Sequence, residues 1–469
     1  MHEIRHSAHG YWLEEAPAPE PLPRLTEDLA AEVVIIGGGY TGMWTAWHLL
    51  DRLAPSSIVL LEASICGHGP SGRNGGFCET LWLNLPSLRE RLGDERALRL
   101  VLRSVESVEA IGAFCEEHGV DAWYRRRGTI TASAAPAQDD AGRDAVAAAA
   151  ALGVPERVVA LSPEEVRRRC ASPVFRGGVY VPDEATVQPA RLALGLRRVL
   201  AERGVRIFEH TRARRLAPAA GGGVAVTTAD GRTVRAGRAV LAINAAARGF
   251  RPLRGRLAVT SSHVLITEPV PDVLEQLGWT GGENITDGRT FVHYFRTTPD
   301  KRIAFGWGGG RIAWGARLGG RTEVDPDVVR ATHRHLLRVF PQLEGRRIEH
   351  AWGGPIDVSP SHLPQVGTLP EAPVHYAFGF TGNGVGPSHL AARTLAALAT
   401  GETAGDELTA LHGDRDAKVP PEPLAWAGGS LVRLANLRKE ELEEQGRVPS
   451  PGLRAIAGAP RMLGIHLGR

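Results

Sequence analysis

Short apolar runs alternate with glycine-rich turns and amphipathic stretches along most of this chain. The first run covers residues 33–36, and a glycine cluster separates it from residues 44–50, where apolar residues recur at helical spacing. A second apolar run covers residues 58–61. Short apolar runs bounded by turn residues are typical of buried strands. The pattern therefore predicts a strand, a helix and a second strand over residues 32–62.

The middle of the chain repeats this alternation, and the pattern of apolar and polar residues then changes. Residues 86–118 carry apolar side chains at helical spacing, and a helix is predicted to begin near Pro189 and to end at Gly204. Residues 239–243 read as another buried strand. Residues 254–350, in contrast, hold long alternating stretches that predict a large antiparallel sheet with few helices. The first domain is therefore predicted to be discontinuous in sequence.

The turn after the first strand has the spacing GxGxxG. Glycine is required there because the backbone turns sharply and approaches a pyrophosphate closely, and because the next helix packs tightly on its strand. The second strand ends in Glu62, 20 residues after Gly42, where an acid accepts hydrogen bonds from a ribose. This order of elements predicts a dinucleotide site, and the unit alone leaves FAD and NAD open. Its candidate ligands are Gly37, Gly39, Tyr40, Thr41, Gly42, Glu62 and Ala63.

Two more glycine-rich loops are candidates for the same site. The first, residues 67–76, follows the acid-bearing strand, and its backbone amides are predicted to extend the contact with the cofactor. The second, residues 382–387, joins a strand over 375–380 to a helix over 388–398, so that the positive end of a helix faces it. The candidates in the two loops are Ser71, Gly72, Arg73, Asn74, Gly75, Gly76, Gly382, Asn383, Gly384, Val385 and Gly386.

Composition narrows the class of protein. The 469 residues are 43% hydrophobic and 23% charged, values typical of a globular protein with more than one domain, and the net charge of +3 gives no support to nucleic-acid binding. The four cysteines form no CxxC pair, and His333 and His335 point to different faces of a helix, so no metal site is expected. No apolar run approaches the roughly 18 residues of a membrane span. Without a signal-peptide core, a cytoplasmic protein with free thiols is expected.

Several of these segments match one known family. GGGYTGMWTAWHL at 37–49, LLEASICG followed by SGRNGG at 60–76, and YAFGFTGNGVGPSHLAARTLAALATG at 376–401 resemble the FAD-dependent oxidoreductases of the D-amino-acid and glycine oxidase type. Within that group the chain is most similar to γ-glutamylputrescine-oxidase-like enzymes. The resemblance covers roughly residues 30–405 and continues into a tail that such proteins often carry.

The resemblance implies a fold and a division of the chain. The fold is α/β (α+β overall), with a Rossmann-like FAD-binding domain of the glutathione-reductase type that is interrupted by an antiparallel-sheet substrate domain. Segments 30–85, 176–253 and 351–405 are expected to build the FAD-binding domain. Segments 86–175 and 254–350 are expected to build the substrate domain, and residues 406–469 form a C-terminal tail with an amphipathic helix.

The resemblance also assigns roles around the FAD. It implies that the backbone at Ala213 passes the adenine, and that the amides of residues 382–386 face the pyrimidine edge of the flavin, where negative charge develops on reduction. Asn244, at the end of a strand, completes the expected FAD contacts. Relatives that bind flavin covalently use a histidine or a cysteine, and the matching positions hold Asn74 and Gly354. The FAD is therefore expected to be non-covalent.

Gly354 also bears on the substrate. Relatives that oxidise amino acids bind the substrate carboxylate with an arginine, and Gly354 stands in that arginine's place. We therefore expect a primary or secondary amine without an adjacent carboxylate, for example one derived from a polyamine. Asp357 either attracts the ammonium group or is a hydrogen-bonded structural aspartate. The expected reaction is hydride transfer from the α-carbon to the flavin, followed by hydrolysis of the imine. The candidate pocket residues are His293, Tyr294, Arg296, Trp307 and Trp352.

The electron acceptor and two other functions are left open by the sequence. Dioxygen is the expected acceptor and an electron carrier is the alternative, because Ala304 stands where some relatives carry an oxygen-activating lysine. The alternative functions are an amino-acid oxidase or dehydrogenase of the same family, and a flavin-binding subunit of a larger dehydrogenase. The tail either docks such a partner or packs on its own domain, and the oligomeric state is open. Its apolar helical face holds Leu431, Leu434, Ala435 and Leu442.

Overall fold

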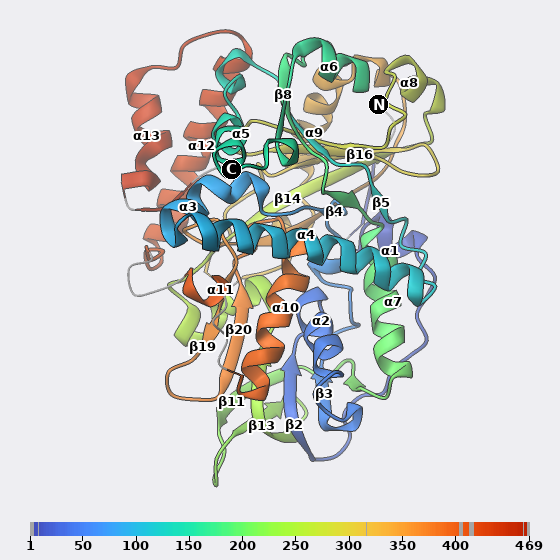
Figure 1. The fold of residues 1–469 in the computed structure, drawn as a ribbon, viewed down its shortest axis with the longest axis vertical. Coiled ribbons are helices and arrows are strands. Elements are labelled where there is room, and N and C mark those ends of the chain that lie inside the picture. Colours follow the sequence, from blue (N-terminus) through green and yellow to red (C-terminus); the bar gives the residue numbers. More distant parts are fainter. Residues whose placement is uncertain are drawn as a thin grey trace.

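Two large sheets stacked end to end organise the molecule. The computed structural model describes residues 4–7, 9–315, 317–402, 407–411, 417–462 and 464–466. Within these residues the strands form a nine-stranded sheet (sheet A), an eight-stranded sheet (sheet B) and a small three-stranded sheet. Sheet A occupies the upper half of the view in Figure 1 and sheet B the lower half, with the long helix α4 (Asp94–Glu117) crossing between them.

Sheet B contains the strand–helix–strand unit predicted at the N-terminal end of the fold. Its central strands run parallel, so their carboxyl ends lie at one edge, which faces sheet A. The parallel strands are β10 (Arg206–Phe208), β3 (Ile58–Leu61), β2 (Leu29–Ile36), β13 (Thr233–Leu241) and β20 (Val374–Phe378). The antiparallel additions are β11 (Ala213–Pro218), β12 (Val224–Thr228) and β19 (Gln365–Thr368).

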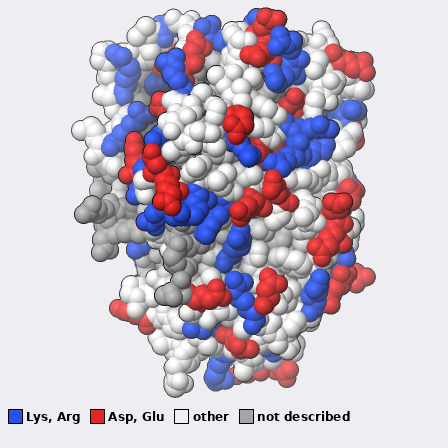
Figure 2. Space-filling model, in the orientation of Figure 1, with Lys and Arg blue, Asp and Glu red and all other residues white. Residues whose placement is uncertain are grey.

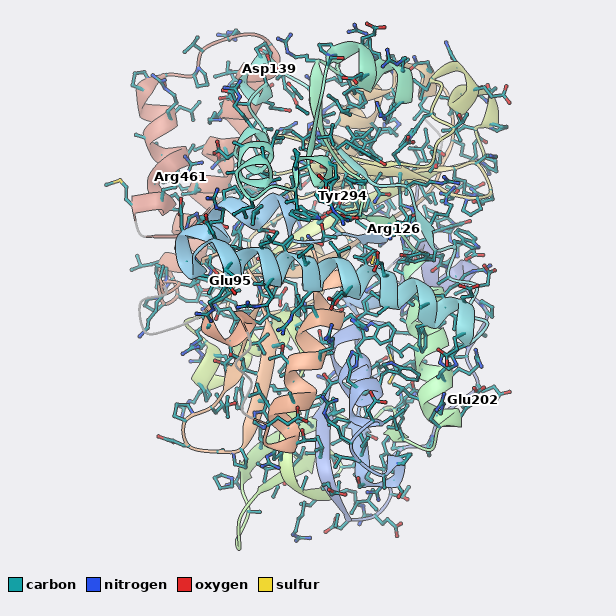
Figure 3. All side chains as sticks on the ribbon, viewed as in Figure 1. Glu95, Arg126, Asp139, Glu202, Tyr294 and Arg461 are labelled. Atoms are coloured by element: carbon teal, nitrogen blue, oxygen red, sulfur yellow. The ribbon has the colours of Figure 1, made fainter. Side chains whose placement is uncertain are left out.

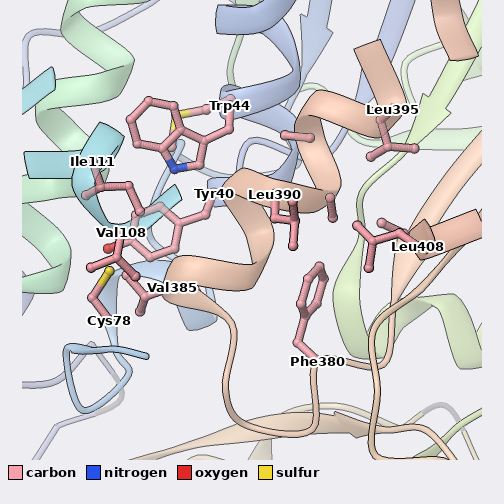
Figure 4. Packing of buried hydrophobic residues seen from close by; sticks show 14 of the residues in the cluster. Tyr40, Trp44, Cys78, Val108, Ile111, Phe380, Val385, Leu390, Leu395 and Leu408 are labelled. Carbon is pink, nitrogen blue, oxygen red and sulfur yellow. The ribbon is translucent and has the colours of Figure 1, made fainter. Parts of the chain in front are cut away.

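Two helices that both begin at this edge pack side by side on sheet B. They are α2 (Tyr40–Leu49) and α10 (Val385–Thr400), and α7 (Pro189–Glu202) lies beside α2. Trp44 is fully buried at the centre, where its ring lies 4.9 Å from the rings of both Phe114 on α4 and His389 on α10. Figure 4 shows how Tyr40 and Trp44 meet Val108, Ile111 and Leu390 in this core. Burial of these side chains therefore fixes where the two helices start.

Sheet A is mostly antiparallel, and it includes the sheet predicted for residues 254–350. Its strand order is β1-β18-β14-β17-β16-β15-β6-β8-β7. The strands are β1 (Arg5–His6), β6 (Thr129–Ser133), β7 (Val159–Leu161), β8 (Gly177–Val181), β14 (Ala258–Thr267), β15 (Asn284–Asp287), β16 (His293–Thr297), β17 (Ile303–Trp307) and β18 (Ile348–Val358). The small sheet, β4 (Phe77–Cys78), β9 (Ala185–Thr186) and β5 (Arg125–Arg126), lies between the two large ones.

The remaining helices cover the flanks. They are α1 (Tyr11–Glu15), α3 (Leu85–Leu92), α5 (Arg143–Ala151), α6 (Pro163–Arg169), α8 (Pro271–Gln276), α9 (Pro326–Val339), α11 (Glu407–Ala410), α12 (Leu424–Glu444) and α13 (Pro451–Met462). No helix in the described ranges is both long and apolar enough to span a membrane. Acidic and basic side chains are interspersed on the face shown in Figure 2.

The structure differs from the sequence-based description in one helix and in the first residues of two segments. The helix expected over residues 86–118 is split into α3 and α4 at Gly93, whose φ of 77° is strained for residues with a side chain. The segments 176–253 and 351–405 each begin in a strand, β8 or β18, that pairs within sheet A. Pairing across the chain, which periodicity does not encode, sets this membership. The expected boundary between residues 405 and 406 lies outside the described residues.

The tail forms a helical pair on the flank of sheet A. Figure 1 shows α12 and α13 side by side at the left edge of the molecule, and Asn436 Nδ2 donates to Ala457 O at 3.2 Å between them. The predicted apolar face is divided, because Ala435 and Leu442 are buried whereas Leu431 and Leu434 are 56% and 58% exposed. The tail thus packs on its own chain with part of that face.

A buried ion pair fixes the edge of sheet B. Glu209, directly after β10, accepts hydrogen bonds at 2.7 Å from the backbone amide of Cys66 and from both Nε and Nη2 of Arg197 on α7. Burial raises the pKa of Glu209, but the bonds from Arg197 and Cys66 outweigh this effect and leave the pKa below its ordinary value. The pair joins α7 to the loop that follows β3.

We expect Glu209→Ala to lower the free energy of unfolding by about 3–5 kcal/mol, because it leaves the buried Arg197 without its counter-charge. Glu202→Ala is the matched control: Glu202 also pairs with an arginine of α7, Arg198, but both side chains are about half exposed, so little change is expected. Denaturant unfolding measures both. The stabilisation by Glu209 is present above the ordinary glutamate pKa of about 4.3 and is lost as the pH falls below it. Equal losses in the two variants would contradict this account.

Candidate active site

A large cavity lies where the carboxyl edge of sheet B meets sheet A. Its volume is about 1300 Å³, which exceeds the range of about 300–1000 Å³ usual for one small ligand. Its walls come from the turns after β2 and β3, from strands β14, β16 and β18, and from helices α12 and α13. Figure 3 labels Tyr294, one of the lining residues, just above α4, on the side of sheet A. The cavity has room for a dinucleotide and a second small molecule.

The glycine turn between β2 and α2 forms one end of the cavity. Gly37 has a φ of 109°, and a Cβ at this position would overlap the carbonyl oxygen of Ala242, directly after β13. A Cβ at Gly42 would overlap the carbonyl oxygen of Gly37. Glycine at both positions therefore lets α2 start directly against its strand. The first amides of α2 have no partner within the helix, so this end of the cavity carries hydrogen-bond donors and a partial positive charge.

Glu62 lies beside this helix start, where β3 ends. Its Oε2 accepts from Gly38 N and its Oε1 from Ser64 N, both at 2.8 Å, so the carboxylate is held in one orientation. Each oxygen retains a lone pair for a ligand. An acid fixed in this way at the end of the second strand suits a ribose hydroxyl.

The loop over residues 67–76 folds onto the start of α2. Ser71 Oγ accepts from Tyr40 N at 2.9 Å, so the loop takes up one of the free helical amides. Asn74 donates to the carbonyls of Pro70 and Ser71 and accepts from Gly76 N at 2.7 Å. The Asn74 side chain thus organises the loop itself.

The second glycine-rich turn is tied to β18. Asp357 is buried, and its Oδ2 accepts from Gly379 N at 2.5 Å. Burial raises the pKa of Asp357 to about 7, although hydrogen bonds from the backbone amides of Gly379 and Phe380 and from the Asn244 side chain lower it. Of the two roles considered for Asp357, these bonds support the structural one. A Cβ at Gly354, three residues earlier, would meet no protein atom within 4 Å and would project into open space.

Most of the predicted cofactor ligands line this cavity. Those that do are Gly37, Gly39, Tyr40, Thr41, Glu62, Ala63, Ser71, Arg73, Asn74, Gly75, Ala213, Asn244, Gly382, Gly384 and Val385. Gly42, Gly72, Gly76, Asn383 and Gly386 are not among the lining residues. For all of these except Asn383, a Cβ would overlap a neighbouring backbone carbonyl, so these glycines allow close packing behind the cavity wall.

Tyr294 is the predicted pocket residue that lines the cavity. Its hydroxyl lies 2.7 Å from Ser262 Oγ, which also donates to Trp307 O at 2.9 Å. Burial raises the pKa of Tyr294 to about 12, so the hydroxyl stays protonated at neutral pH. The ring packs over Gly306 on the neighbouring strand, where a Cβ would overlap it. Glycine at position 306 therefore leaves the space that the Tyr294 ring occupies.

His293 and Trp307 lie behind the wall. Because successive side chains of a strand point to opposite faces, His293 cannot share a face with Tyr294. Its ring bonds to Asp287 through Nδ1 at 2.6 Å and to His335 through Nε2 at 2.8 Å. Burial, together with Arg289 and Arg338, holds the pKa of His293 well below its ordinary value, so the ring is neutral. His335, judged a poor metal ligand from its spacing, is a hydrogen-bond partner here.

Trp352 and Arg296 support the wall from outside. Trp352 Nε1 donates to Arg73 O at 2.8 Å, and its indole ring packs against Trp12 with ring centroids 5.8 Å apart. Arg296 lies with its guanidinium 5.4 Å from the Trp12 ring and donates to the carbonyl of Gly76 at 3.2 Å. Both side chains therefore hold the loop over residues 67–76 in place and do not line the cavity.

The sequence reasoning missed several lining residues. Arg212, Arg214 and Arg215 lie beside Ala213, and the arginine-rich segment after β10 was a signal for them. His9, Glu323 and the residues of α12 and α13 had no such signal, because they reach the cavity only through tertiary packing. The histidines among the described lining residues are His9, His68 and His362, and no cysteine is among them.

The residues present fit a dinucleotide. The start of α2 supplies free amides, Glu62 supplies an oriented carboxylate, and the start of α10 at Val385 supplies a second set of amides. Asn244 lines the cavity, and its Oδ1 is buried without a hydrogen-bond partner. A buried polar atom without a partner is costly, and a bound ligand group satisfies it.

Comparison with known proteins identifies the dinucleotide. The model of a family described as FAD dependent oxidoreductase matches residues 32–398. A probable oxidoreductase, OrdL, from Rhizobium meliloti (strain 1021) is 29% identical over 91% of this chain and 95% of its own length. The gamma-glutamylputrescine oxidoreductase of Escherichia coli (strain K12) is 28% identical over 90% of this chain and 94% of its own.

Solved structures share the fold. Glycine oxidase from Geobacillus kaustophilus superposes with a TM-score of 0.67 at 22% identity, covering 82% of this chain and 99% of its own. L-amino acid deaminase from Proteus vulgaris gives a TM-score of 0.67 at 16% identity, covering 85% of this chain and 99% of its own. Sheet B with its helices is accordingly a Rossmann-like FAD-binding unit, and sheet A belongs to the second domain.

The contact between Gly42 and the Gly37 carbonyl gives a test of the FAD site. We expect Gly42→Ala to weaken FAD binding about tenfold to a hundredfold, because α2 must move away from the strand and carry its amides with it. Titration of the apoprotein with FAD, followed by flavin fluorescence, measures the affinity. Gly255→Ala is the control, since a Cβ there meets no atom within 4 Å and Gly255 lies outside the cavity. Unchanged affinity in Gly42→Ala would contradict the assignment.

Proposed function

The chain belongs to the family of FAD-dependent oxidoreductases, and on this premise we propose that it oxidises a C–N bond of an amine. The substrate is a primary or secondary amine without a carboxylate next to the reacting carbon. The product imine hydrolyses in water. FAD, when bound, supplies the hydride acceptor. The name of the Escherichia coli relative, gamma-glutamylputrescine oxidoreductase, supports an amine derived from a polyamine.

The observation that carries this proposal is the open space at Gly354. The position lies on the cavity wall, and a side chain there would extend into the cavity without meeting protein atoms. An arginine at this place would bind a carboxylate in a bidentate pair, and glycine removes that pair completely. Losing the charged partner disfavours an α-amino acid relative to a simple amine.

The protein's own contribution is binding and exclusion of water. Tyr294 and Ser262 offer a neutral pair of hydroxyls on the wall formed by sheet A, and Phe77 packs edge-on against the Tyr294 ring with centroids 5.6 Å apart. Such a surface holds the amine in one orientation, which is the main requirement for hydride transfer. A dedicated base is not required, because the amine reacts in its neutral form and water takes its proton beforehand.

We further propose dioxygen as the electron acceptor, with an electron carrier as the alternative. None of the lysines lines the cavity within the described residues, and Ala304 is buried in β17. The cytoplasm is the proposed location, since the four cysteines are free and buried, as is usual for thiols in a reducing compartment. Turnover by the purified chain alone would distinguish an enzyme from a subunit of a larger dehydrogenase.

The FAD is proposed to be non-covalent, because Asn74 and Gly354 offer no nucleophile and Cys66 and Cys78 are buried with thiol pKa values raised by burial. We expect acid precipitation to leave a colourless pellet and a yellow supernatant. His68 lines the cavity and gives the control. If the pellet of the wild type is yellow and that of His68→Ala is colourless, the proposal is wrong and His68 is the attachment site.

The substrate class is tested by anaerobic bleaching of the flavin absorbance with polyamines, N-methylamines, γ-glutamylated amines and amino acids. We expect amines to bleach the flavin and glycine and D-amino acids to be inert. A peroxide assay in air then decides between oxidase and dehydrogenase.

The role of Gly354 has its own variant in this assay. Gly354→Arg should raise the ratio of amino-acid to amine reduction rates by about tenfold to a hundredfold, the value of a charge-assisted hydrogen bond. Gly354→Leu fills the same space without charge and should slow both classes alike. Rapid bleaching of the wild type by glycine, with amines inert, would overturn the proposal.

A further inference from the structure

The C-terminal helices build one wall of the cavity. The residues of α12 and α13 in this wall are apolar or glycine, apart from Arg433 on α12. These residues lie beyond residue 398, where the match to the family model ends. The wall is thus supplied by a segment outside the common fold, and a difference in substrate between relatives can be encoded there.

This wall is fixed in position by buried charges. Arg289, in the loop before β16, donates to Glu440 from Nε at 3.1 Å and from Nη2 at 2.9 Å, and to Glu444 from Nη1 at 2.8 Å. The other oxygen of Glu440 accepts from Thr290 N at 2.6 Å and from Phe291 N at 3.2 Å. A buried carboxylate with four donors holds α12 against sheet A, so its lining side chains are pre-positioned.

Arg433 is the charged residue of this wall, and the carboxylate whose charge acts on it, Asp325, already pairs with Arg311. Its Nε donates to the carbonyls of Gly309 at 3.0 Å and Gly310 at 2.5 Å, and its Nη2 donates to Gly309 O at 2.7 Å. Arg433 forms no ion pair with any described residue, and its Nη1 has no hydrogen-bond partner among them. Two other arginines of the cavity are neutralised: Arg73 pairs with Glu323 and Arg289 pairs with two glutamates.

Arg433 lies at the same end of the cavity as Tyr294. The Tyr294 hydroxyl bonds to Ser262, which bonds to the carbonyl of Trp307. Gly308 follows and lines the cavity, and the next two carbonyls are those that Arg433 holds. The guanidinium therefore flanks the wall proposed to receive the substrate. It is half-buried, where an attraction between charges is screened less than at the surface.

We propose that Arg433 binds a carboxylate on the part of the amine substrate that does not react. The guanidinium presents its remaining N–H donors on Nη1 and Nη2, and a carboxylate supplies both the missing charge and the two acceptors that such a fork prefers. The inference rests on the proposed amine chemistry and narrows its substrate class to amines with a distant anionic group. It is compatible with Gly354, which removes a clamp only beside the reacting carbon.

The test uses the FAD-loaded protein and ligands that cannot react. Binding of hexanoate and of hexanamide is measured from the perturbation of the flavin absorbance spectrum. We expect the wild type to bind hexanoate more tightly than hexanamide, with a preference that falls as ionic strength rises. Arg433→Gln, which keeps amide donors for the two glycine carbonyls, should weaken hexanoate binding about tenfold to a hundredfold and leave hexanamide binding unchanged.

Two further variants separate binding from a structural role. Arg433→Lys keeps the charge and should retain the preference for hexanoate in reduced form. Arg438→Gln removes an exposed arginine of the same helix that pairs with Glu441, and should change neither ligand. Equal loss of both ligands in Arg433→Gln would show that Arg433 merely anchors α12, and no preference for hexanoate in the wild type would overturn the proposal.

Flavin bleaching by hexylamine and 6-aminohexanoate then links the site to the reaction. The carboxylate-bearing amine should lose its advantage in Arg433→Gln, with the effect on KM and not on kcat. If neither amine bleaches the flavin while hexanoate binding still depends on Arg433, the amine chemistry fails and the anion site stands. If both amines bleach it equally in the wild type, the anion site fails and the amine chemistry stands.

Discussion

The approach of helix α2 to the turn at Gly37 is the constraint on which the site depends. Without side chains at Gly37 and Gly42, the helix starts against the ends of β2 and β13, and its free amides face the cavity. The same placement lets Gly38 and Ser64 hold Glu62 from two sides. It also sets Trp44 between α4 and α10, so the start of α10 is fixed by packing against α2. Two helix starts from distant parts of the chain thereby face the same cavity.

The parts of the site that could be predicted are those that a short, continuous stretch of sequence determines. Three such features lie at the boundaries of predicted elements: the glycines of the first turn, Glu62 at the end of β3, and the strand-to-helix turn before Val385. At each boundary, the residue types indicate one backbone geometry. The resemblance to a family joined the two halves into one FAD site. Fold class and cofactor follow from the same motifs, because each short segment carries both a strand-to-helix turn and polar groups suited to a dinucleotide.

The parts that could not be predicted depend on contacts between distant segments. His293 and Tyr294 are neighbours in sequence, and the period of a strand allows only one of them to line the cavity; the sequence does not say which, because this depends on the position of sheet B and α9. Trp352 carries an aromatic ring suited to a pocket, yet it supports the backbone of Arg73 from behind. Arg433 could not be predicted as a cavity residue, because the sequence pattern of the polar tail does not indicate that its helix packs over a cavity.

The segments that line the cavity are also synthesised at different times. The ribosome synthesises the glycine turn over residues 37–42 and the loop up to Gly76 before α12, and Arg433 follows about 360 residues after Gly76. At roughly 5–20 residues per second, this interval lasts roughly 20 to 70 seconds. During it, the wall that α12 supplies is missing, so this side of the site stays open to solvent. The wall formed by α12 is therefore completed only after Glu440 has been synthesised and its buried carboxylate has reached Arg289.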